Sequence, residues 1–253
     1  MRLLSLKMKM FGFHLLVATL AFSAAVYANA QEVSDKTVWD GIYSADQAAR
    51  GKIVYEASCA VCHSADLTGS DQGRPLAGDP FKQDWMEDTV GNLYSRMSRL
   101  MPFEEPGSLN DQAYLDVLAY ILEFNLYPVG SEELTTDGLD EIRIEGPDGP
   151  GPVPSFALVQ VLGCLTRMSG NNWSLTSGTE PVRTREPSSS SSDELASLQS
   201  VTGPHTFALL NVYPSPDDSE GHQVEVKGLL IRLPERTRIN VSSVSVIGPS
   251  CEP

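Results

Sequence analysis

Two cysteines and a histidine lie within one short run, Cys59-Ala60-Val61-Cys62-His63. Thiols three positions apart can each bond to one vinyl group of a haem, and the adjacent imidazole can then coordinate the iron. A structural zinc site would need a second close pair of ligands, whereas Cys164, Cys251, His205 and His222 are scattered over a distant part of the chain. A thioredoxin-type pair would follow a strand, and a short-loop disulfide needs no adjacent histidine. The run therefore predicts one covalently bound haem c.

A methionine downstream is expected to supply the second axial ligand of the iron. Three candidates follow His63, namely Met86, Met97 and Met101. Met97 falls inside a predicted helix, where a methionine usually fills core space. Met101 precedes Pro102, which pushes it out of the helical region into an extended conformation. We therefore expect Met101 to bind the iron. A thioether opposite an imidazole raises the reduction potential and leaves no open iron position.

Three predicted helices must position these residues. Ser44 caps the first helix, which runs straight into Cys59. The second follows Thr89 and ends near Leu100, and the third starts at the capping box 108–111. The buried face of the third helix consists of Tyr114, Leu115, Leu118, Ile121 and Leu122. Such short helices form only a modest core by themselves, and a haem would fill its centre.

These features occur in the order of a known family. The attachment run, the turn Pro75-Leu76-Ala77-Gly78, Met101-Pro102 and a closing helix with Ala119-Tyr120-Ile121 make residues 39–128 resemble class I c-type cytochromes, the small monohaem domains. The resemblance implies that the first and last helices cross with Gly51 against Tyr120. It also implies that the carbonyl of Pro75 accepts the free imidazole N–H of His63 and fixes the ring orientation.

The sequence leaves two possible roles open for each of two further side chains, Trp85 and Arg74. Trp85 lies near a haem propionate or is an ordinary core aromatic. Arg74 pairs with a propionate or is exposed to solvent, and the sequence favours exposure.

The first thirty residues are typical of a secretory signal peptide. A basic start is followed by an apolar run, and Ala28-Asn29-Ala30 matches the small-x-small cleavage pattern. We expect cleavage after Ala30 and export to the periplasm, where cysteines are bonded or committed to a cofactor. The alternative is an uncleaved membrane anchor, because the apolar run is near the length that spans a bilayer.

Composition divides the rest of the chain and excludes some functions. The formal net charge is −15, which argues against nucleic-acid binding. After the signal peptide 1–30, we expect a helical cytochrome c domain at 31–128. Residues 129–155 are rich in Pro, Gly and acidic side chains and are typical of a linker. Residues 156–253 read as a small β-barrel domain, so the predicted fold class is α + β with two domains.

The barrel prediction rests on five runs rich in Val, Leu, Ile and Thr, at 156–166, 173–179, 206–212, 222–231 and 238–247. Five strands in such a length suggest a closed barrel, which resembles the OB-like folds (oligonucleotide/oligosaccharide-binding). The serine-rich stretch 187–200 reads as a disordered surface loop.

Cys164 and Cys251 lie near the two ends of this second domain. An oxidising compartment favours a disulfide between them, and two unpaired thiols are the alternative. His205 and His222 are expected to be surface or capping histidines, because no cysteine or carboxylate cluster accompanies them.

Taken together, the patterns predict a periplasmic electron-transfer protein that is not itself an enzyme. Its expected partners are periplasmic redox proteins. The resemblance implies a quinoprotein-type dehydrogenase as donor and a terminal oxidase as acceptor, with membrane contact only if the signal segment is retained. Two alternatives stay open. One is a haem enzyme or sensor with an open sixth iron position, and the other is a module that binds a partner or a carbohydrate through the barrel.

Overall fold

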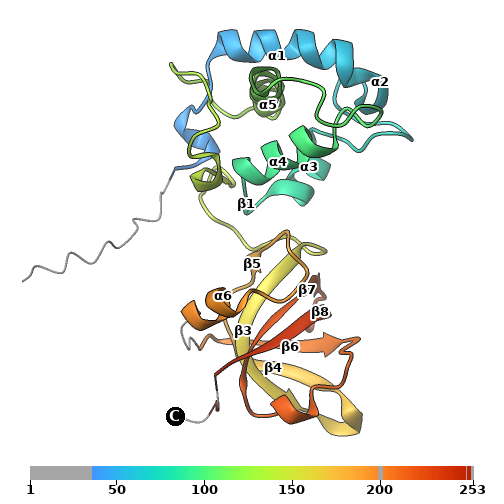
Figure 1. Ribbon diagram of the computed structural model, residues 1–253, viewed down its shortest axis with the longest axis vertical. Coiled ribbons are helices and arrows are strands. Elements are labelled where there is room, and N and C mark those ends of the chain that lie inside the picture. Colours follow the sequence, from blue (N-terminus) through green and yellow to red (C-terminus); the bar gives the residue numbers. More distant parts are fainter. Residues whose placement is uncertain (1–35, 199–201, 249, 252–253) are drawn as a thin grey trace, which may run out of the picture. The chain divides into compact units, whose positions relative to one another are not determined.

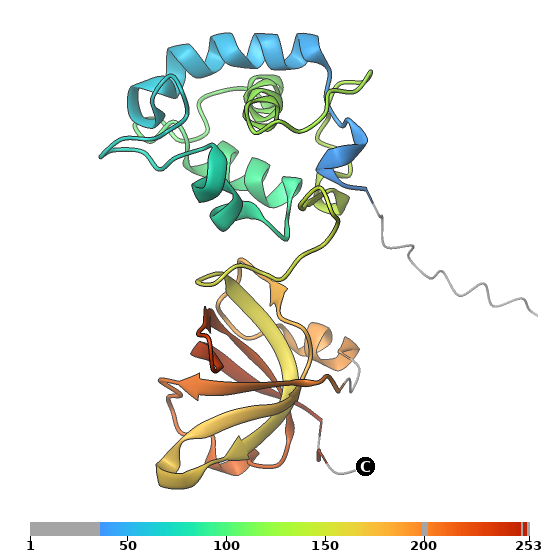
Figure 2. The same cartoon turned by 180° about the vertical axis from the view of Figure 1, so that it is seen from behind.

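The computed structural model describes residues 36–198, 202–248 and 250–251. The predicted signal peptide and its cleavage site lie outside the described residues. A helical part and a β-barrel follow one another along the chain, as Figures 1 and 2 show. This is the α + β architecture that the sequence predicts.

Four helices of more than one turn frame the helical part: α1 (Ala45–Ser58), α3 (Gly78–Trp85), α4 (Val90–Leu100) and α5 (Asp111–Phe124). The short 3-10 helix η1 (Val38–Asp40) precedes them, and the one-turn α2 (Ala60–His63) follows α1 directly. The Ser44 side chain caps α1, as predicted. Helix α4 begins after Thr89, as predicted, and the Thr89 side chain caps it. Within the predicted capping box of α5, the side chain that accepts the backbone N–H is that of Asn110. Helix α3 is not predicted from the sequence.

Helices α1 and α5 cross one another (Figure 1). A Cβ atom at Gly51 would lie 1.8 Å from the carbonyl oxygen of Asp116, so only glycine permits this crossing. The family resemblance places Tyr120 opposite Gly51. In the structure Gly51 meets the backbone of Asp116 and Val117, and the ring of Tyr120 packs on Tyr55 with centroids 5.3 Å apart. At Gly51 the helices approach closely enough for backbone to touch backbone.

The segment predicted as a linker contributes to the helical core. Four apolar side chains between residues 130 and 146 are buried there: Leu134, Leu139, Ile142 and Ile144. The strand β2 (Arg143–Ile144) pairs with β1 (Asp88–Thr89), beside the 3-10 helix η2 (Leu139–Glu141). The Gln47 side chain holds the backbone of Leu134 with two hydrogen bonds, of 2.9 and 2.8 Å. The segment is rich in acidic residues, which is typical of a linker. Its few apolar side chains nevertheless pack into the helical core and hold the segment against it.

The second part is a closed five-stranded barrel, and its strands lie where the sequence predicts them. They are β3 (Leu158–Arg167), β4 (Trp173–Gly178), β6 (His205–Leu210), β7 (Gln223–Arg232) and β8 (Thr237–Gly248). The order around the barrel is β3-β4-β6-β8-β7, and β7 pairs back to β3. Strands β6 and β8 run parallel, and the other pairs are antiparallel. The 3-10 helices η3 (Ser169–Asn171) and η4 (Asp217–Ser219) lie in the connections.

Two short elements between β4 and β6 are missing from the sequence prediction. Strand β5 (Val182–Arg183) pairs with β3, and helix α6 (Ser192–Ser197) lies within the serine-rich stretch. The prediction of disorder is therefore wrong for the described residues 187–198. Ser190 donates hydrogen bonds to Glu225, so this stretch covers the outer side of β7 and buries both Glu225 and Lys227.

Candidate haem-binding site

Helix α1 delivers the first cysteine to the site. The backbone N–H of Cys59 donates to the Tyr55 carbonyl at 2.8 Å, and the N–H of His63 then donates to the Cys59 carbonyl at 3.0 Å. One helical turn therefore holds both cysteines and the histidine. Cys59 and Cys62 are free thiols. Burial, and to a smaller extent the nearby Cys62, raises the pKa of Cys59 to about 11, so this thiol is protonated at neutral pH.

The His63 ring is oriented by a backbone carbonyl. Its Nδ1 lies 2.7 Å from the carbonyl oxygen of Arg74. Because a carbonyl can only accept, Nδ1 carries the proton, and Nε2 keeps the lone pair that a metal ligand needs. The expected acceptor was the carbonyl of Pro75. The structure uses the preceding carbonyl, that of Arg74, which belongs to the Arg74–Pro75 peptide bond, because the turn at 70–73 brings this oxygen to the ring.

A glycine lets that loop approach the attachment run. A Cβ atom at Gly73 would lie 2.6 Å from the Cys62 carbonyl oxygen and 3.0 Å from Nδ1 of His63. The Ser70 hydroxyl also donates to the Cys62 carbonyl at 2.6 Å. The loop thus packs closely against the Cys62 backbone and the His63 imidazole. This donor set and the closely packed loop fit a covalently attached haem. The sequence gives no signal for Gly73, because only the folded loop brings it to Cys62 and His63.

Met101 lies directly after α4 in the extended conformation that Pro102 predicts, with φ −126° and ψ 152°. The Tyr114 hydroxyl, on α5, donates to the Met101 carbonyl at 2.6 Å and fixes the backbone there. Met97 packs partly buried against the helical core. Met86 ends α3, where its carbonyl accepts a hydrogen bond from Arg183. Met97 thus lies inside α4, whereas Met86 and Met101 lie on non-helical backbone just after α3 and α4.

Trp85 and Arg74 have protein partners in the structure. Trp85 is buried, and the guanidinium of Arg185 lies 4.3 Å from its ring centroid. Arg74 is largely exposed, as the sequence favours, and pairs with Asp84 at 2.7 Å. The sequence predicts Trp85 either near a haem propionate or as a core aromatic, and it gives no sign of the contact with Arg185.

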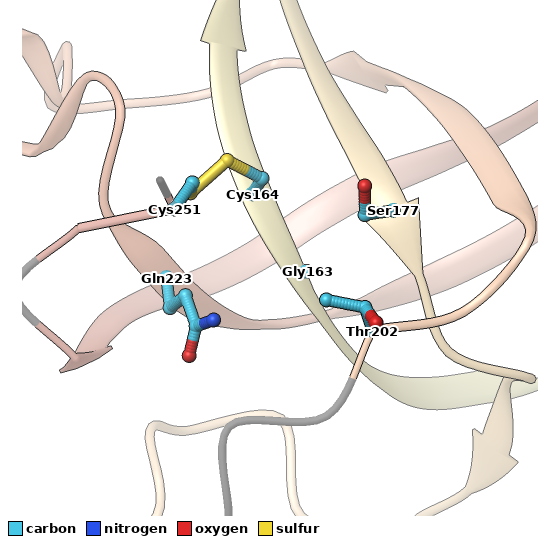
Figure 3. A pocket seen from close by; sticks show the side chains of 6 residues that line it. All are labelled: Gly163, Cys164, Ser177, Thr202, Gln223 and Cys251. Atoms are coloured by element: carbon cyan, nitrogen blue, oxygen red, sulfur yellow. A yellow bond between two sulfur atoms is a disulfide. The ribbon is translucent and has the colours of Figure 1, made fainter. Parts of the chain in front are cut away.

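The barrel carries a disulfide between Cys164 and Cys251, whose Cα atoms lie 5.7 Å apart (Figure 3). It borders a small cavity of about 20 Å³, which is about the space of one water molecule. The side-chain oxygen of Gln223 is buried at this cavity and finds no hydrogen-bond donor among the described residues. The cavity is too small for a cofactor or a sugar.

The two barrel histidines have simple surroundings. His205 contacts the Glu180 carboxylate, and Nδ1 of His222 lies 3.2 Å from the Glu220 carbonyl. Across residues 36–198, 202–248 and 250–251, no group of three or more His, Cys, Asp or Glu side chains is arranged to hold a metal ion.

A larger cavity of about 360 Å³ lies under the serine-rich stretch, beside Lys227 and Gln160. The Nζ of Lys227 lies 3.8 Å from the Glu225 carboxylate, which is itself hydrogen-bonded by Gln160 and Ser190. Glu225 and Lys227 lie on the face of β7 opposite to the core residues Val224 and Val226. The structure buries this face under residues that the sequence predicts to be disordered.

A comparison with protein families supports a haem-binding role for the helical part. Residues 46–121 match the family described as "Cytochrome C oxidase, cbb3-type, subunit III". No curated protein matches the chain. Among solved structures, the chain is similar to the sulfane dehydrogenase SoxCD from Paracoccus pantotrophus, at 22% identity and a TM-score of 0.31. That match covers 42% of this chain and 61% of the other.

The helical part is therefore a cytochrome c domain, and a five-stranded barrel follows it. Among the described residues, none of the helices has the length and apolar character needed to cross a bilayer.

Proposed function

We propose that this chain is an exported carrier of single electrons with one haem c, bound covalently through Cys59 and Cys62. The observation that carries the proposal is the helical turn from Cys59 to His63, in which two free thiols stand next to an imidazole already oriented by a carbonyl. The family match of residues 46–121 supports the same chemistry. When bound, haem c supplies a one-electron couple of the iron.

His63 and Met101 are the proposed axial ligands. The Arg74 carbonyl holds the His63 ring and makes Nε2 the free donor. The Tyr114 hydroxyl holds the Met101 backbone, which supports a fixed position for the thioether. With both ligands bound, the iron has no position for oxygen or a substrate, so the protein carries electrons rather than catalysing a reaction.

The proposed location is the periplasm, after cleavage of residues 1–30. The disulfide between Cys164 and Cys251 is consistent with an oxidising compartment. We propose periplasmic redox proteins as partners, with a quinoprotein-type dehydrogenase as donor and a terminal oxidase as acceptor. The barrel, whose strand order resembles an OB-like fold, would bind one of these partners.

The test uses the full-length chain, expressed in a host that attaches haem c. The expected product contains one haem per chain, and its oxidised form has the weak sulfur-to-iron charge-transfer absorption. Met101→Leu should abolish this absorption. Met97→Leu is the matched control, because Met97 lies one helical turn earlier and packs against the core, and it should leave the absorption intact.

Three results would contradict the proposal. A colourless protein would exclude haem attachment. An unchanged spectrum in Met101→Leu would exclude His/Met ligation. Rapid binding of carbon monoxide or turnover of peroxide by the wild-type protein would instead support a haem enzyme or sensor with an open sixth position.

A further inference from the structure

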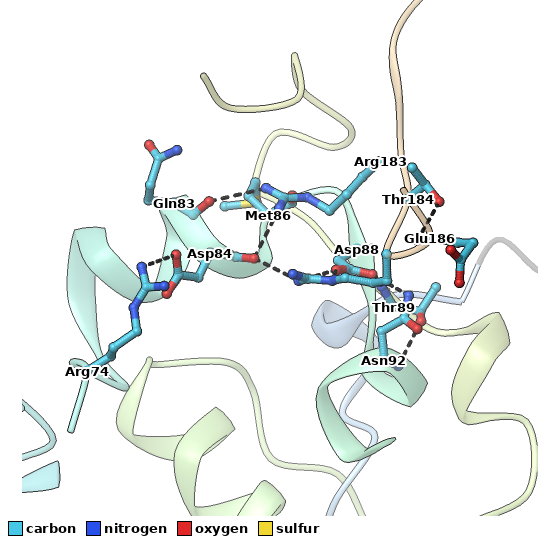
Figure 4. Close-up of polar contacts among 11 residues, drawn as sticks. Arg74, Gln83, Asp84, Met86, Asp88, Thr89, Asn92, Arg183, Thr184 and Glu186 are labelled. Atoms are coloured by element: carbon cyan, nitrogen blue, oxygen red, sulfur yellow. Dashed lines mark hydrogen bonds and ion pairs between the residues drawn. The ribbon is translucent and has the colours of Figure 1, made fainter. Parts of the chain in front are cut away.

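The C-terminal end of α3 is held by two arginines that lie about a hundred residues further along the chain. Arg183 donates to three backbone carbonyls, from Nε to Met86 at 2.8 Å, from Nη1 to Asp84 at 3.1 Å and from Nη2 to Gln83 at 3.2 Å (Figure 4). Arg185 adds a bond from Nη2 to the same Asp84 carbonyl at 2.9 Å. The last carbonyls of a helix lack partners within the helix and carry its negative dipole end, so two guanidinium groups suit them well.

These arginines are anchored in the barrel. Arg183 belongs to β5 and pairs with Val159 of β3, and the N–H of Thr184 donates to the Leu158 carbonyl at 3.0 Å. Desolvation lowers the pKa of Arg183, which reflects how far its guanidinium is withdrawn from water. A guanidinium stays charged in proteins, so the three carbonyls must offset the cost of that desolvation.

The guanidinium of Arg185 makes two further contacts, one through its planar face and one through its Nε edge. It stacks on the Trp85 ring, and its Nε donates to the Asp88 carboxylate at 2.6 Å. Asp88 is buried, so this charged hydrogen bond is shielded from water. Both ends of the short stretch from Trp85 to Asp88 are therefore fixed by the same arginine.

Asp84 connects this clamp to the haem-binding site. Its backbone carbonyl accepts from Arg183 and Arg185. Its carboxylate accepts from the guanidinium of Arg74 at 2.7 Å (Figure 4). The carbonyl of the same Arg74 accepts the Nδ1 proton of His63 at 2.7 Å. Thus the residue that orients the imidazole is held through its side chain by a helix whose end the barrel fixes.

We propose that Arg183 and Arg185 are positioning residues for the haem ligand His63, so that the barrel adjusts the reduction potential of the cytochrome c domain. The inference rests on the proposed function only in that His63 binds haem iron. A well-aligned Nδ1–H to carbonyl bond makes the imidazole a stronger donor and favours the oxidised iron. Misalignment of Arg74 therefore raises the reduction potential.

The sign of the effect separates positioning from simple charge. Arg183→Lys keeps the positive charge but loses the planar fork that reaches three carbonyls. Positioning predicts that this variant raises the potential, seen as a two- to tenfold shift in the equilibrium of electron exchange with a reference dye. An effect of charge alone predicts no change in Arg183→Lys and a lower potential in Arg183→Met.

Asp84→Asn tests the connecting step, because it weakens the pair with Arg74 and leaves the backbone carbonyl in place. We expect the same direction of shift, and a double variant with Arg183→Lys that shifts less than the sum of the two. Arg232→Lys is the matched control. Arg232 is also a barrel arginine that donates to a backbone carbonyl, that of Val153, and it should leave the potential unchanged.

A second measurement reports on His63 directly. The ring Nδ1 proton of the reduced haem protein should move in the NMR spectrum of Arg183→Lys and exchange faster with solvent than in the wild type. An unchanged potential together with an unchanged ring proton in folded Arg183→Lys and Asp84→Asn would overturn the inference. Failure of the proposed function would be seen earlier, as wild-type protein without haem or without sulfur ligation.

Discussion

At the scale of single residues, the site depends on a glycine that brings no chemical group of its own. Gly73 lies so close to Cys62 and His63 that the smallest side chain would collide with both. We expect Gly73→Ala to push the loop away, to break the bond between His63 and the Arg74 carbonyl and to lower the yield of haem-loaded protein several-fold. The haem-to-protein ratio, measured by absorbance after purification, checks this.

Gly146→Ala serves as the control for that substitution. A Cβ atom at Gly146 would have its nearest contact at 3.7 Å, an ordinary van der Waals distance. Its haem content should equal that of the wild type. Equal haem content in Gly73→Ala would mean that the loop adapts easily and that its close packing is not needed for attachment.

Buried phenols make stability fall in alkaline solution. Burial is the main cause that raises the pKa of Tyr43 to about 12, and burial raises the pKa of Tyr127 to about 12 as well. In the unfolded chain a phenol titrates near pH 10, so between pH 10 and 12 the unfolded state binds fewer protons than the folded state. Stability present below pH 10 is therefore lost as the pH rises, by about 1.4 kcal/mol per pH unit for each such phenol.

Denaturant unfolding at a series of pH values should reveal this slope. Tyr43→Phe should make it shallower, although the variant also loses the 2.6 Å hydrogen bond to the Tyr127 carbonyl and starts from a lower stability. Tyr213→Phe, which changes an exposed ring, should leave the slope as it is. Parallel curves for wild type and Tyr43→Phe would exclude Tyr43 as a source of the pH dependence.

At the scale of elements, the helical core depends on how closely α1 approaches α5. Gly51→Ala would place a methyl group 1.8 Å from the Asp116 carbonyl oxygen, so the helices must separate. We expect the free energy of unfolding to fall by about 3 kcal/mol. Ala49→Ser, on the exposed side of the same helix, should cost about 0.5 kcal/mol. Chemical denaturation of both variants measures the difference, and similar costs would show that the crossing is loose.

The disulfide should stabilise the barrel because it joins β3 to the end of the described chain. It closes a loop with a sequence separation of 87, which the chain-entropy model makes worth about 4.6 kcal/mol. Replacing Cys164 and Cys251 together by serine should lower the barrel's free energy of unfolding by up to about that amount. Wild-type protein treated with reductant should lose the same stability. An unchanged unfolding curve after reduction would mean that strain in the native bridge cancels its benefit.

Elements defined by local pattern are predicted well from the sequence, and those completed by distant residues are not. Strand β7 is recognised because Val224 and Val226 alternate with polar residues. Helix α3 is missed because its N-terminal N–H at Gly78 bonds to the Asn125 side chain and its C-terminal carbonyls bond to Arg183 and Arg185. No window of sequence around 78–85 contains those partners.

The same distinction applies within the candidate site. The run from Cys59 to His63 is predictable because its chemistry lies in five neighbouring residues. The hydrogen-bond acceptor of His63 is one residue away from the predicted one, because a loop conformation decides which carbonyl faces the ring. The positions of Gly73 and Asp84 depend on the folded loop and on α3, and the sequence carries no signal for either.

At the scale of the whole molecule, the strong negative charge should govern how redox partners meet this protein. The formal net charge is −15, so long-range attraction favours partners with a positive docking face. We expect the rate constant of electron exchange with a cationic small oxidant to fall as ionic strength rises, and that with an anionic oxidant to increase. Stopped-flow measurements from low to high salt check this. The same salt dependence for both oxidants would show that charge near the electron's exit differs from the net charge.

The burial of Leu134, Leu139, Ile142 and Ile144 determines where recombinant dissection of this protein can succeed. A truncation ending at Pro128 would remove these side chains and also the bonds of Arg50 to Glu133. It would expose an apolar surface on α1 and α4, and such surfaces promote aggregation. A fragment extended to Gly146 keeps this apolar surface covered. Of the two fragments, we expect the one that ends at Gly146 to stay in solution.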